Sequence, residues 1–322
     1  MKACGIIFLT TTMCSGLERT GRWVKSSYCI EGYYFSEKTF QNPVPEQIYI
    51  RKVFLGTVGK TYKIYPHLEG LNLFYNLLQD NESKNLLVKL VAFRMLGHRK
   101  VRLPLSTPVY WKGIDELENL LDKKEKYAGM NLLDLRTKQI EVSLYYIPKG
   151  AYATFVVEQY KYSSPSKSSV AKAGDVVLDG GGCYGDTALY FAAKVCGKES
   201  GKVFPFEFIP SNLDVLKKNS SMNPDLPRFI TVAENPLWEE SGKQVFYKEA
   251  GSSSQVQFQE FEDQDGETTT VSIDDFVARN NLSKVDFIKM DIEGAEPVAL
   301  KGGINTIKKF KPKLALHLSQ HG

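Results

Sequence analysis

The pattern of apolar and polar positions changes about halfway along the chain. After residue 174, short apolar runs alternate with stretches of helical periodicity, which predicts an α/β domain built on a parallel sheet. Helices are expected up to Cys196 and over residues 213–218, and residues 244–258 are expected to form an inserted hairpin. The expected strands are residues 176–178, 203–206, 229–232, 285–290 and 314–318.

The first half has a different pattern. Residues 1–70 show no sustained period and predict irregular structure with short strands. Residues 71–96 are helical, with a polar break at Asp80 and an end at Gly97, and a second helix is expected over residues 113–123. Residues 140–146 alternate as a half-buried strand, paired through a turn at Pro148 with residues 151–160.

A serine-rich stretch over residues 163–169 has the composition of a linker. We therefore expect two domains: an α+β cap or acceptor region over residues 1–162, and a cofactor-binding domain over residues 170–322. A length of 322 residues, with 43% apolar and 24% charged residues, suits two globular domains.

Charge and cysteine content narrow the class of protein. The net charge is only +4, and basic residues are scattered among acidic ones, so no nucleic-acid partner is expected. Five cysteines without a C-x-x-C pair argue against a disulfide framework and a zinc site, which favours a reducing cytoplasm. The first residues lack the features of a signal peptide, and no run is long enough to span a membrane.

The segment from Asp179 to Gly185 fits both G-x-G-x-x-G and D-x-G-x-x-x-G. Its glycines let the backbone turn tightly beside a ligand, and in a turn without ligand they would add no packing. Glu207, after the next strand, suits the two ribose hydroxyls of an adenosine. Asp179 separates the two templates, because its carboxylate would repel a pyrophosphate but attract the cations of S-adenosylmethionine.

Three segments, DVVLDGGGCYGDTALYFA, FEFIP and VDFIKMDIEGAE, in this order and spacing, resemble the FkbM family of S-adenosylmethionine-dependent methyltransferases. The similarity covers roughly residues 170–318. It implies a class I, Rossmann-like methyltransferase fold, S-adenosylmethionine as cofactor, and methyl transfer to a hydroxyl of a small-molecule, sugar or glycolipid-type acceptor.

The resemblance assigns roles to particular residues. Those expected to bind the cofactor are Asp179, Gly181, Cys183, Gly185, Glu207 and Phe208, and those matching the D-x-E-G-x-E signature are Asp291, Glu293, Gly294 and Glu296. One departure is Pro205, which removes a donor from the second strand and predicts a local irregularity or a missing hydrogen bond there.

Asp291 and Glu293 are the candidates for holding and deprotonating the acceptor, since methyl transfer from a sulfonium mainly requires positioning and a base. Lys289 and Asp291 are expected on one face of their strand. The alternative is that Asp291 grips the cofactor while Glu293 and Glu296 cap the next helix. A magnesium-assisted variant has no visible second ligand pair, so no metal is expected.

Other chemistry-bearing residues have plainer interpretations. His317 has the intrinsic pKa of a base but lies in an apolar strand, which favours a core role. The aromatic residues Tyr110, Trp111, Tyr145 and Tyr146 are candidates for a sugar-stacking face or for core packing.

The sequence stops four residues after the fifth expected strand, whereas the resemblance implies a further helix and two further strands. We expect a truncated sheet whose edge, at Leu314, Leu316 and Leu318, is prone to self-association. Two functions compete with O-methyl transfer: a non-catalytic cofactor-binding or scaffold protein, and a nicotinamide-dependent oxidoreductase.

Overall fold

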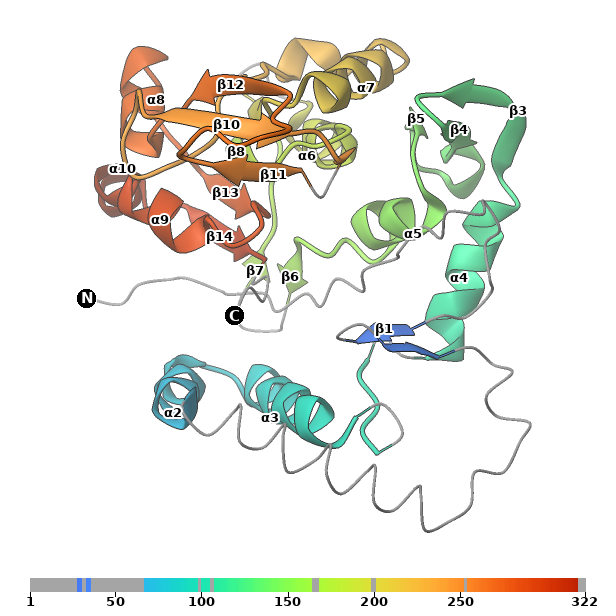
Figure 1. Ribbon diagram of the computed structural model, residues 1–322. Helices are drawn as coiled ribbons and strands as arrows, with labels where there is room; N and C mark the ends of the chain where they lie inside the picture. Colours follow the sequence, from blue (N-terminus) through green and yellow to red (C-terminus); the bar gives the residue numbers. More distant parts are fainter. Residues whose placement is uncertain are drawn as a thin grey trace. The chain divides into compact units, whose positions relative to one another are not determined.

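The computed structural model describes residues 28–30, 33–35, 67–97, 100–104, 107–163, 168–197, 201–251 and 254–317 (Figure 1). Most of the region before residue 67, and Leu318, lie outside these residues. The chain divides into two compact units, Met13–Gly113, and Ile114–Gly322 together with Met1–Thr12. This division falls upstream of the boundary expected at residues 163–169. None of the described helices is long and apolar enough to cross a membrane.

In the first unit, β1 (Tyr28–Ile30) pairs antiparallel with β2 (Tyr33–Phe35). The helical stretch is two helices, α2 (Leu68–Leu77) and α3 (Asn81–Leu96). The predicted break is confirmed: the Asp80 carboxylate accepts the amide of Ser83 at 2.7 Å as the N-cap of α3. Gly97 ends the helix with a φ of 81°, a conformation open to glycine.

The second unit is an α/β fold around a parallel sheet of order β14-β13-β8-β9. Its strands are β8 (Val176–Gly180), β9 (Lys202–Phe206), β13 (Phe287–Met290) and β14 (Lys313–Leu316). The expected strand at 229–232 is reduced to bridges beside β9, with Ile230 opposite Val203 and Ala233 opposite Phe206. Four of the five predicted strands are thus confirmed.

Side chains alternate between the two faces of this sheet. Val177 and Phe287 belong to one buried cluster, whereas Leu178 and Ile288 belong to the other. The alternation follows from the two-residue period of a strand and buries both faces, as in α/β proteins. It also places Asp179 and Lys289, two residues beyond Val177 and Phe287, on the face covered by α6 (Asp186–Val195).

The remaining helices are α7 (Pro210–Ser221), the 3₁₀ turn η5 (Pro227–Phe229), α8 (Ile273–Arg279), α9 (Glu296–Lys301) and α10 (Ile304–Phe310). The hairpin predicted over residues 244–258 is confirmed as β10 (Gln244–Lys248) and β11 (Gln255–Gln257), and β12 (Gly266–Thr269) extends it to three strands. Pro205 causes no irregularity in register: it pairs with Asp179, and its carbonyl accepts the amide of Ala233 at 2.8 Å.

Two predictions for residues 108–160 were wrong. The helix α4 (Pro108–Glu118) begins and ends earlier than expected, since proline favours a first turn and residues 121–127 pair as β3. Pro148 starts a helix instead of a hairpin turn, so α5 (Pro148–Ala151) and the π-helix η4 (Tyr152–Val156) replace the expected strand.

The other elements before the parallel sheet are β3 (Leu121–Tyr127), β4 (Met130–Asp134), η3 (Arg136–Lys138), β5 (Ser143–Tyr145), β6 (Tyr162–Ser163) and β7 (Ser168–Ser169). Apolar residues of this region, including Leu133 and Leu144, share one buried cluster with Leu189 of α6 and Phe287 of β13. The expected cap therefore extends the core of the parallel sheet from residue 114 onward.

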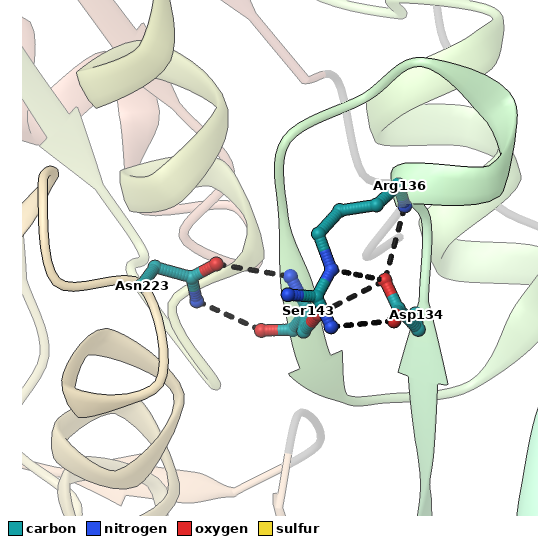
Figure 2. Close-up of polar contacts among 4 residues, drawn as sticks. All are labelled: Asp134, Arg136, Ser143 and Asn223. Atoms are coloured by element: carbon teal, nitrogen blue, oxygen red, sulfur yellow. Dashed lines mark hydrogen bonds and ion pairs between the residues drawn. The ribbon is translucent and has the colours of Figure 1, made fainter.

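Two asparagines hold β5 in place: Asn219 in α7 and Asn223 just after the helix. Figure 2 shows Asn223 facing Ser143, whose amide and carbonyl it binds at 2.9 and 2.8 Å. Asn219 makes the same pair of bonds with Tyr145, at 2.7 and 3.2 Å. β5 is an edge strand of its sheet. Each asparagine side chain binds the N–H and the C=O that a further strand would otherwise pair with, which satisfies these buried backbone groups.

Candidate functional site

The predicted glycine loop connects β8 to α6 and has little freedom. The amides of Gly181 and Gly182 both donate to the carbonyl of Phe206, at 3.2 and 3.0 Å. The Gly185 amide closes the turn on the Gly182 carbonyl at 2.8 Å, and the Tyr184 carbonyl accepts from Asn219 at 2.8 Å. The backbone of the loop is therefore preformed at the carboxyl edge of the sheet, where α/β folds bind ligands.

The glycines of the loop are required by packing, contrary to the expectation that they add none. A Cβ on Gly181 would lie 2.1 Å from the carbonyl oxygen of Asp291, and one on Gly182 would lie 2.8 Å from Pro205. At Gly185 the nearest atom would be Leu216 Cγ at 2.9 Å. Gly181 and Gly185 also have φ values of 81° and 83°. The loop thus lies against β13, β9 and α7 at once.

Asp179 is fully buried, with an exposed fraction of 0%. Its carboxylate accepts the Thr187 hydroxyl at 2.7 Å and forms an ion pair of 3.0 Å with the Nζ of Lys289. The sequence predicted that Asp179 attracts the cofactor cation directly. In the structure its charge is paired with Lys289, whose Nζ also binds the carbonyls of Gly180 and Gly181. Asp179 therefore contacts the loop through Lys289.

Lys289 is the counterion of this region. Its Nζ donates to the carbonyls of Gly180 and Gly181, at 3.0 and 2.8 Å, besides pairing with Asp179. Burial alone lowers the pKa of this ammonium, but the carboxylates of Asp179 and Asp291 outweigh burial and raise it above its ordinary value. The sequence predicted that Lys289 and Asp291 lie on one face of their strand but indicated no role for Lys289.

A second acid, Asp186, begins α6 and is 4% exposed. Burial raises its pKa to about 6, partly opposed by the Thr154 hydroxyl, which it accepts at 2.7 Å, and by the charge of Lys289. Asp179, Asp186 and Asp291 therefore surround one ammonium. With the carboxylates ionised, the cluster is negative overall, which suits a cationic ligand and disfavours a pyrophosphate.

Glu207 follows β9 and is buried, 6% exposed. Its Oε1 accepts the amides of Phe208 and Ile209, each at 2.8 Å. Burial raises the pKa of this carboxyl, whereas those amides, the side chain of Asn212 and the backbone of Cys183 hold it down. The backbone of Cys183, at a φ of 42°, thus links the glycine loop to Glu207.

Phe208 is half-buried and packs edge-on against Tyr247, with ring centroids 5.7 Å apart. A cleft of about 430 Å³ opens beside it. The lining residues are Phe208, Pro210, Leu213, Asp214, Lys217, Glu234, Glu267 and Thr268. Phe208, the neighbour of Glu207, thus borders an open space between α7 and the inserted sheet.

Asp291 directly follows β13 beside the loop, where its amide donates to the Gly180 carbonyl at 3.0 Å. Its partly exposed side chain accepts the hydroxyl of Tyr160 at 3.0 Å. Glu293 is exposed on the following turn with a φ of 54°. The structure therefore places Asp291 at the loop, with Glu293 two residues away on the surface.

Glu296 does not cap the helix as the alternative expected: it is the first residue of α9, whose N-cap Ala295 makes no side-chain cap bond. It is 2% exposed, and its Oε1 accepts the Ile292 amide at 2.9 Å. This bond closes the turn between β13 and α9. His317 is 6% exposed, and its amide donates to the Met290 carbonyl at 2.8 Å, next to Asp291 on the neighbouring strand.

Two residues at the site, Thr154 and Tyr160, were missed because no motif contains them, and Tyr146 was named only as a candidate for sugar stacking or core packing. Tyr146, Thr154 and Tyr160 lie before the glycine loop and contact its acids: Thr154 and Tyr146 meet Asp186, and Tyr160 meets Asp291. Burial raises the pKa of both tyrosines well above the ordinary value, so they remain donors. Tyr145, in contrast, is 6% exposed and packs in the core.

No group of three or more histidine, cysteine, aspartate or glutamate side chains in the described part of the chain is arranged to hold a metal ion. The acids around Lys289 are instead organised by an ammonium and by hydroxyl donors.

In a comparison with known proteins, one family model matches the second half of the chain. Residues 179–321 match the model described as the methyltransferase FkbM domain. No curated protein matches the chain.

Solved structures share parts of the fold. Methyltransferase FkbM from Methylobacillus flagellatus KT is 18% identical with a TM-score of 0.45, over 79% of this chain and 49% of that one. Aeropyrum pernix fibrillarin, in complex with S-adenosyl-L-methionine, is 16% identical with a TM-score of 0.26, over 44% and 42%. A putative O-methyltransferase from Klebsiella pneumoniae is 12% identical with a TM-score of 0.26, over 62% and 60%. The chain thus covers less than two thirds of each, and these likenesses carry no inference about activity.

Proposed function

We propose that this chain, whose residues 179–321 belong to the FkbM family of methyltransferase domains, transfers the methyl group of S-adenosylmethionine to a hydroxyl oxygen. The acceptor class that we propose is a small molecule, a sugar or a glycolipid-type molecule. The proposal rests on the family match together with the charge of the site.

The residues present fit this cofactor. Three carboxylates around Lys289 give a negative environment beside the preformed loop, which complements a ligand with an ammonium and a sulfonium. Glu207 and Phe208 would hold the adenosine end, next to the cleft that Phe208 lines. Gly181, Cys183 and Gly185 would contact the cofactor through their backbone, while Asp179 fixes the loop from below.

When bound, S-adenosylmethionine supplies a methyl group already activated by its sulfonium. The protein then has to orient the acceptor hydroxyl and receive its proton. We assign these tasks to Asp291, whose partly exposed carboxylate lies beside the loop, with Glu293 assisting from the turn. The position of Asp291 is equally compatible with binding the cofactor. The two roles differ in whether loss of the carboxylate lowers turnover or cofactor affinity.

Ligand titration tests the proposed function against its two competitors. Calorimetry should detect binding of S-adenosylhomocysteine but not of NAD, because a pyrophosphate would meet the acids of the site. Transfer of a labelled methyl group to a fraction of cell extract would then exclude a purely scaffolding role. Binding of NAD alone would overturn the proposal in favour of an oxidoreductase.

The Asp291→Asn variant separates the roles of that residue. A base is required in the transition state, so we expect turnover to fall by about 10²–10⁴-fold while the affinity for S-adenosylhomocysteine changes little. Loss of affinity at unchanged turnover would assign Asp291 to cofactor binding. Mass spectrometry of metabolites incubated with protein and labelled cofactor would identify the acceptor.

A further inference from the structure

Tyr160 reaches the site from outside the matched domain, which begins at residue 179. Its hydroxyl donates to Oδ2 of Asp291 at 3.0 Å across 131 residues of sequence. The same ring lies 5.2 Å, centroid to Nζ, from Lys289. One aromatic side chain therefore contacts both charged residues of β13 that face the glycine loop.

The tyrosine is rigidly held. It is 4% exposed and packs against Phe191 of α6, with ring centroids 6.4 Å apart. The preceding turn is fixed to α6 by Glu158, which pairs with Lys194 at 2.6 Å and accepts the hydroxyl of Tyr190 at 3.2 Å. Glu158 also pairs with Lys161. The position of the Tyr160 hydroxyl is thus set by the helix that follows the cofactor loop.

A hydroxyl fixed in this way restricts the Asp291 carboxylate. With Oδ2 engaged by Tyr160, the side chain has one preferred orientation, and its other oxygen remains for a ligand. A bond of this kind therefore controls where the carboxylate points.

We propose that Tyr160 is a positioning residue of the methyl-transfer site, which keeps the Asp291 carboxylate in one orientation beside the cofactor. This inference rests on the proposed function. It implies that the matched domain is incomplete without the segment that carries η4 and Tyr160.

Several titratable groups lie around Asp291. The titratable groups near Asp291 are Tyr160, Tyr146, Lys289, Asp179, Asp186 and His317. A Tyr160→Phe variant changes one of them and keeps the ring that packs against Phe191.

The experiment is calorimetric titration of S-adenosylmethionine and S-adenosylhomocysteine at neutral pH. In Tyr160→Phe the Asp291 carboxylate is no longer held in one orientation, so the affinity for the cationic cofactor should fall by up to about tenfold. S-adenosylhomocysteine, which lacks the sulfonium, should lose less affinity.

Two further variants isolate the cause. Ser143→Ala removes a part-buried hydroxyl–carboxylate bond, to Asp134, away from the site and should leave both affinities unchanged. In an Asp291→Asn background, Tyr160→Phe should have no additional effect on either affinity. Thermal unfolding of each variant checks that the fold is retained.

The outcomes are distinct. Affinities of Tyr160→Phe identical to those of the unmodified protein, or an equal loss for both ligands, overturn the role of Tyr160 and leave the proposed function intact. Absence of any binding to the unmodified protein overturns the proposed function itself.

Discussion

Lys289 and Asp179 are register partners on adjacent parallel strands, and their side chains form an ion pair of 3.0 Å. The exposed fractions are 1% and 0%. Because a buried charge without a partner is costly, each side chain requires the other. The pair also fixes the point at which the glycine loop leaves β8, since the same ammonium binds the carbonyls of Gly180 and Gly181.

Lys289→Met should therefore destabilise the protein by about 3–5 kcal/mol, because it leaves Asp179 buried without a counterion. The double variant Asp179→Asn with Lys289→Met removes both charges and should recover most of that loss. Its affinity for S-adenosylhomocysteine should remain low, because the loop carbonyls have lost their donor. Urea unfolding and calorimetry measure the two effects.

Lys313→Met is the matched control for that prediction. Lys313 pairs with Asp175 at 3.5 Å, and its side chain is 30% exposed, so we expect a change of about 0–1 kcal/mol. If the double variant were as unstable as Lys289→Met alone, the ion pair would not explain the loss.

Gly181→Ala should disrupt the loop. The new Cβ would lie 2.1 Å from the Asp291 carbonyl oxygen at a φ of 81°, so both contact and conformation are unfavourable. We expect a loss of more than about 2 kcal/mol in unfolding free energy and no detectable cofactor binding. Gly242→Ala, at a φ of 85° with nothing within 4 Å, isolates the conformational cost of about 1 kcal/mol. Equal effects of the two variants would contradict a steric role for Gly181.

The sequence predicts those parts of this fold where one local signal dominates. Apolar runs identify β8, β9, β13 and β14, because central parallel strands are buried on both faces. The prediction fails where two signals compete. Alternation over residues 140–146 suggested a hairpin, but Pro148 starts a helix, and the edge of β5 is paired by the side chains of Asn219 and Asn223.

Prediction of the functional site from the sequence has the same limit. The glycine loop, Glu207 and Asp291 follow from motifs, since each lies at the end of a predicted strand. The partners of these residues do not: Tyr160 is 131 residues from Asp291, and nothing local distinguishes it from other tyrosines. Lys289 lies inside a motif, yet its role depends on pairing between β13 and β8, which the sequence does not specify.

Asn223→Ala tests how strongly β5 is held. The change removes both bonds to the Ser143 backbone (Figure 2) and leaves buried polar groups without partners, which should cost about 2–4 kcal/mol. Asn235→Ala, which removes an exposed bond to the Thr269 carbonyl, should cost less than about 1 kcal/mol. Denaturant unfolding followed by tryptophan fluorescence measures both, and similar losses would refute the structural role of Asn223.

Asp186 should make stability depend on pH with an unusual sign for an acid. Its pKa of about 6 is above the ordinary value of 3.8, so the folded state binds this proton more tightly than the unfolded state does. The resulting stabilisation is complete below the ordinary value and is lost as the pH rises through about 6. Replacing Asp186 by Asn removes this dependence, while the amide oxygen can still accept the Thr154 hydroxyl.

We therefore expect Asp186→Asn to gain stability relative to the unmodified protein by about 2 kcal/mol between about pH 4.5 and pH 8. Asp134 provides a comparison of opposite sign. Its hydrogen bond to Arg136 is the main cause that lowers its pKa to about 2, so Asp134→Asn should lose stability relative to the unmodified protein as the pH rises through the acid range. Chemical denaturation of the three proteins at several pH values measures both differences. A difference for Asp186→Asn that stays constant with pH would mean that Asp186 titrates normally, and that burial beneath Thr154 does not disfavour its charge.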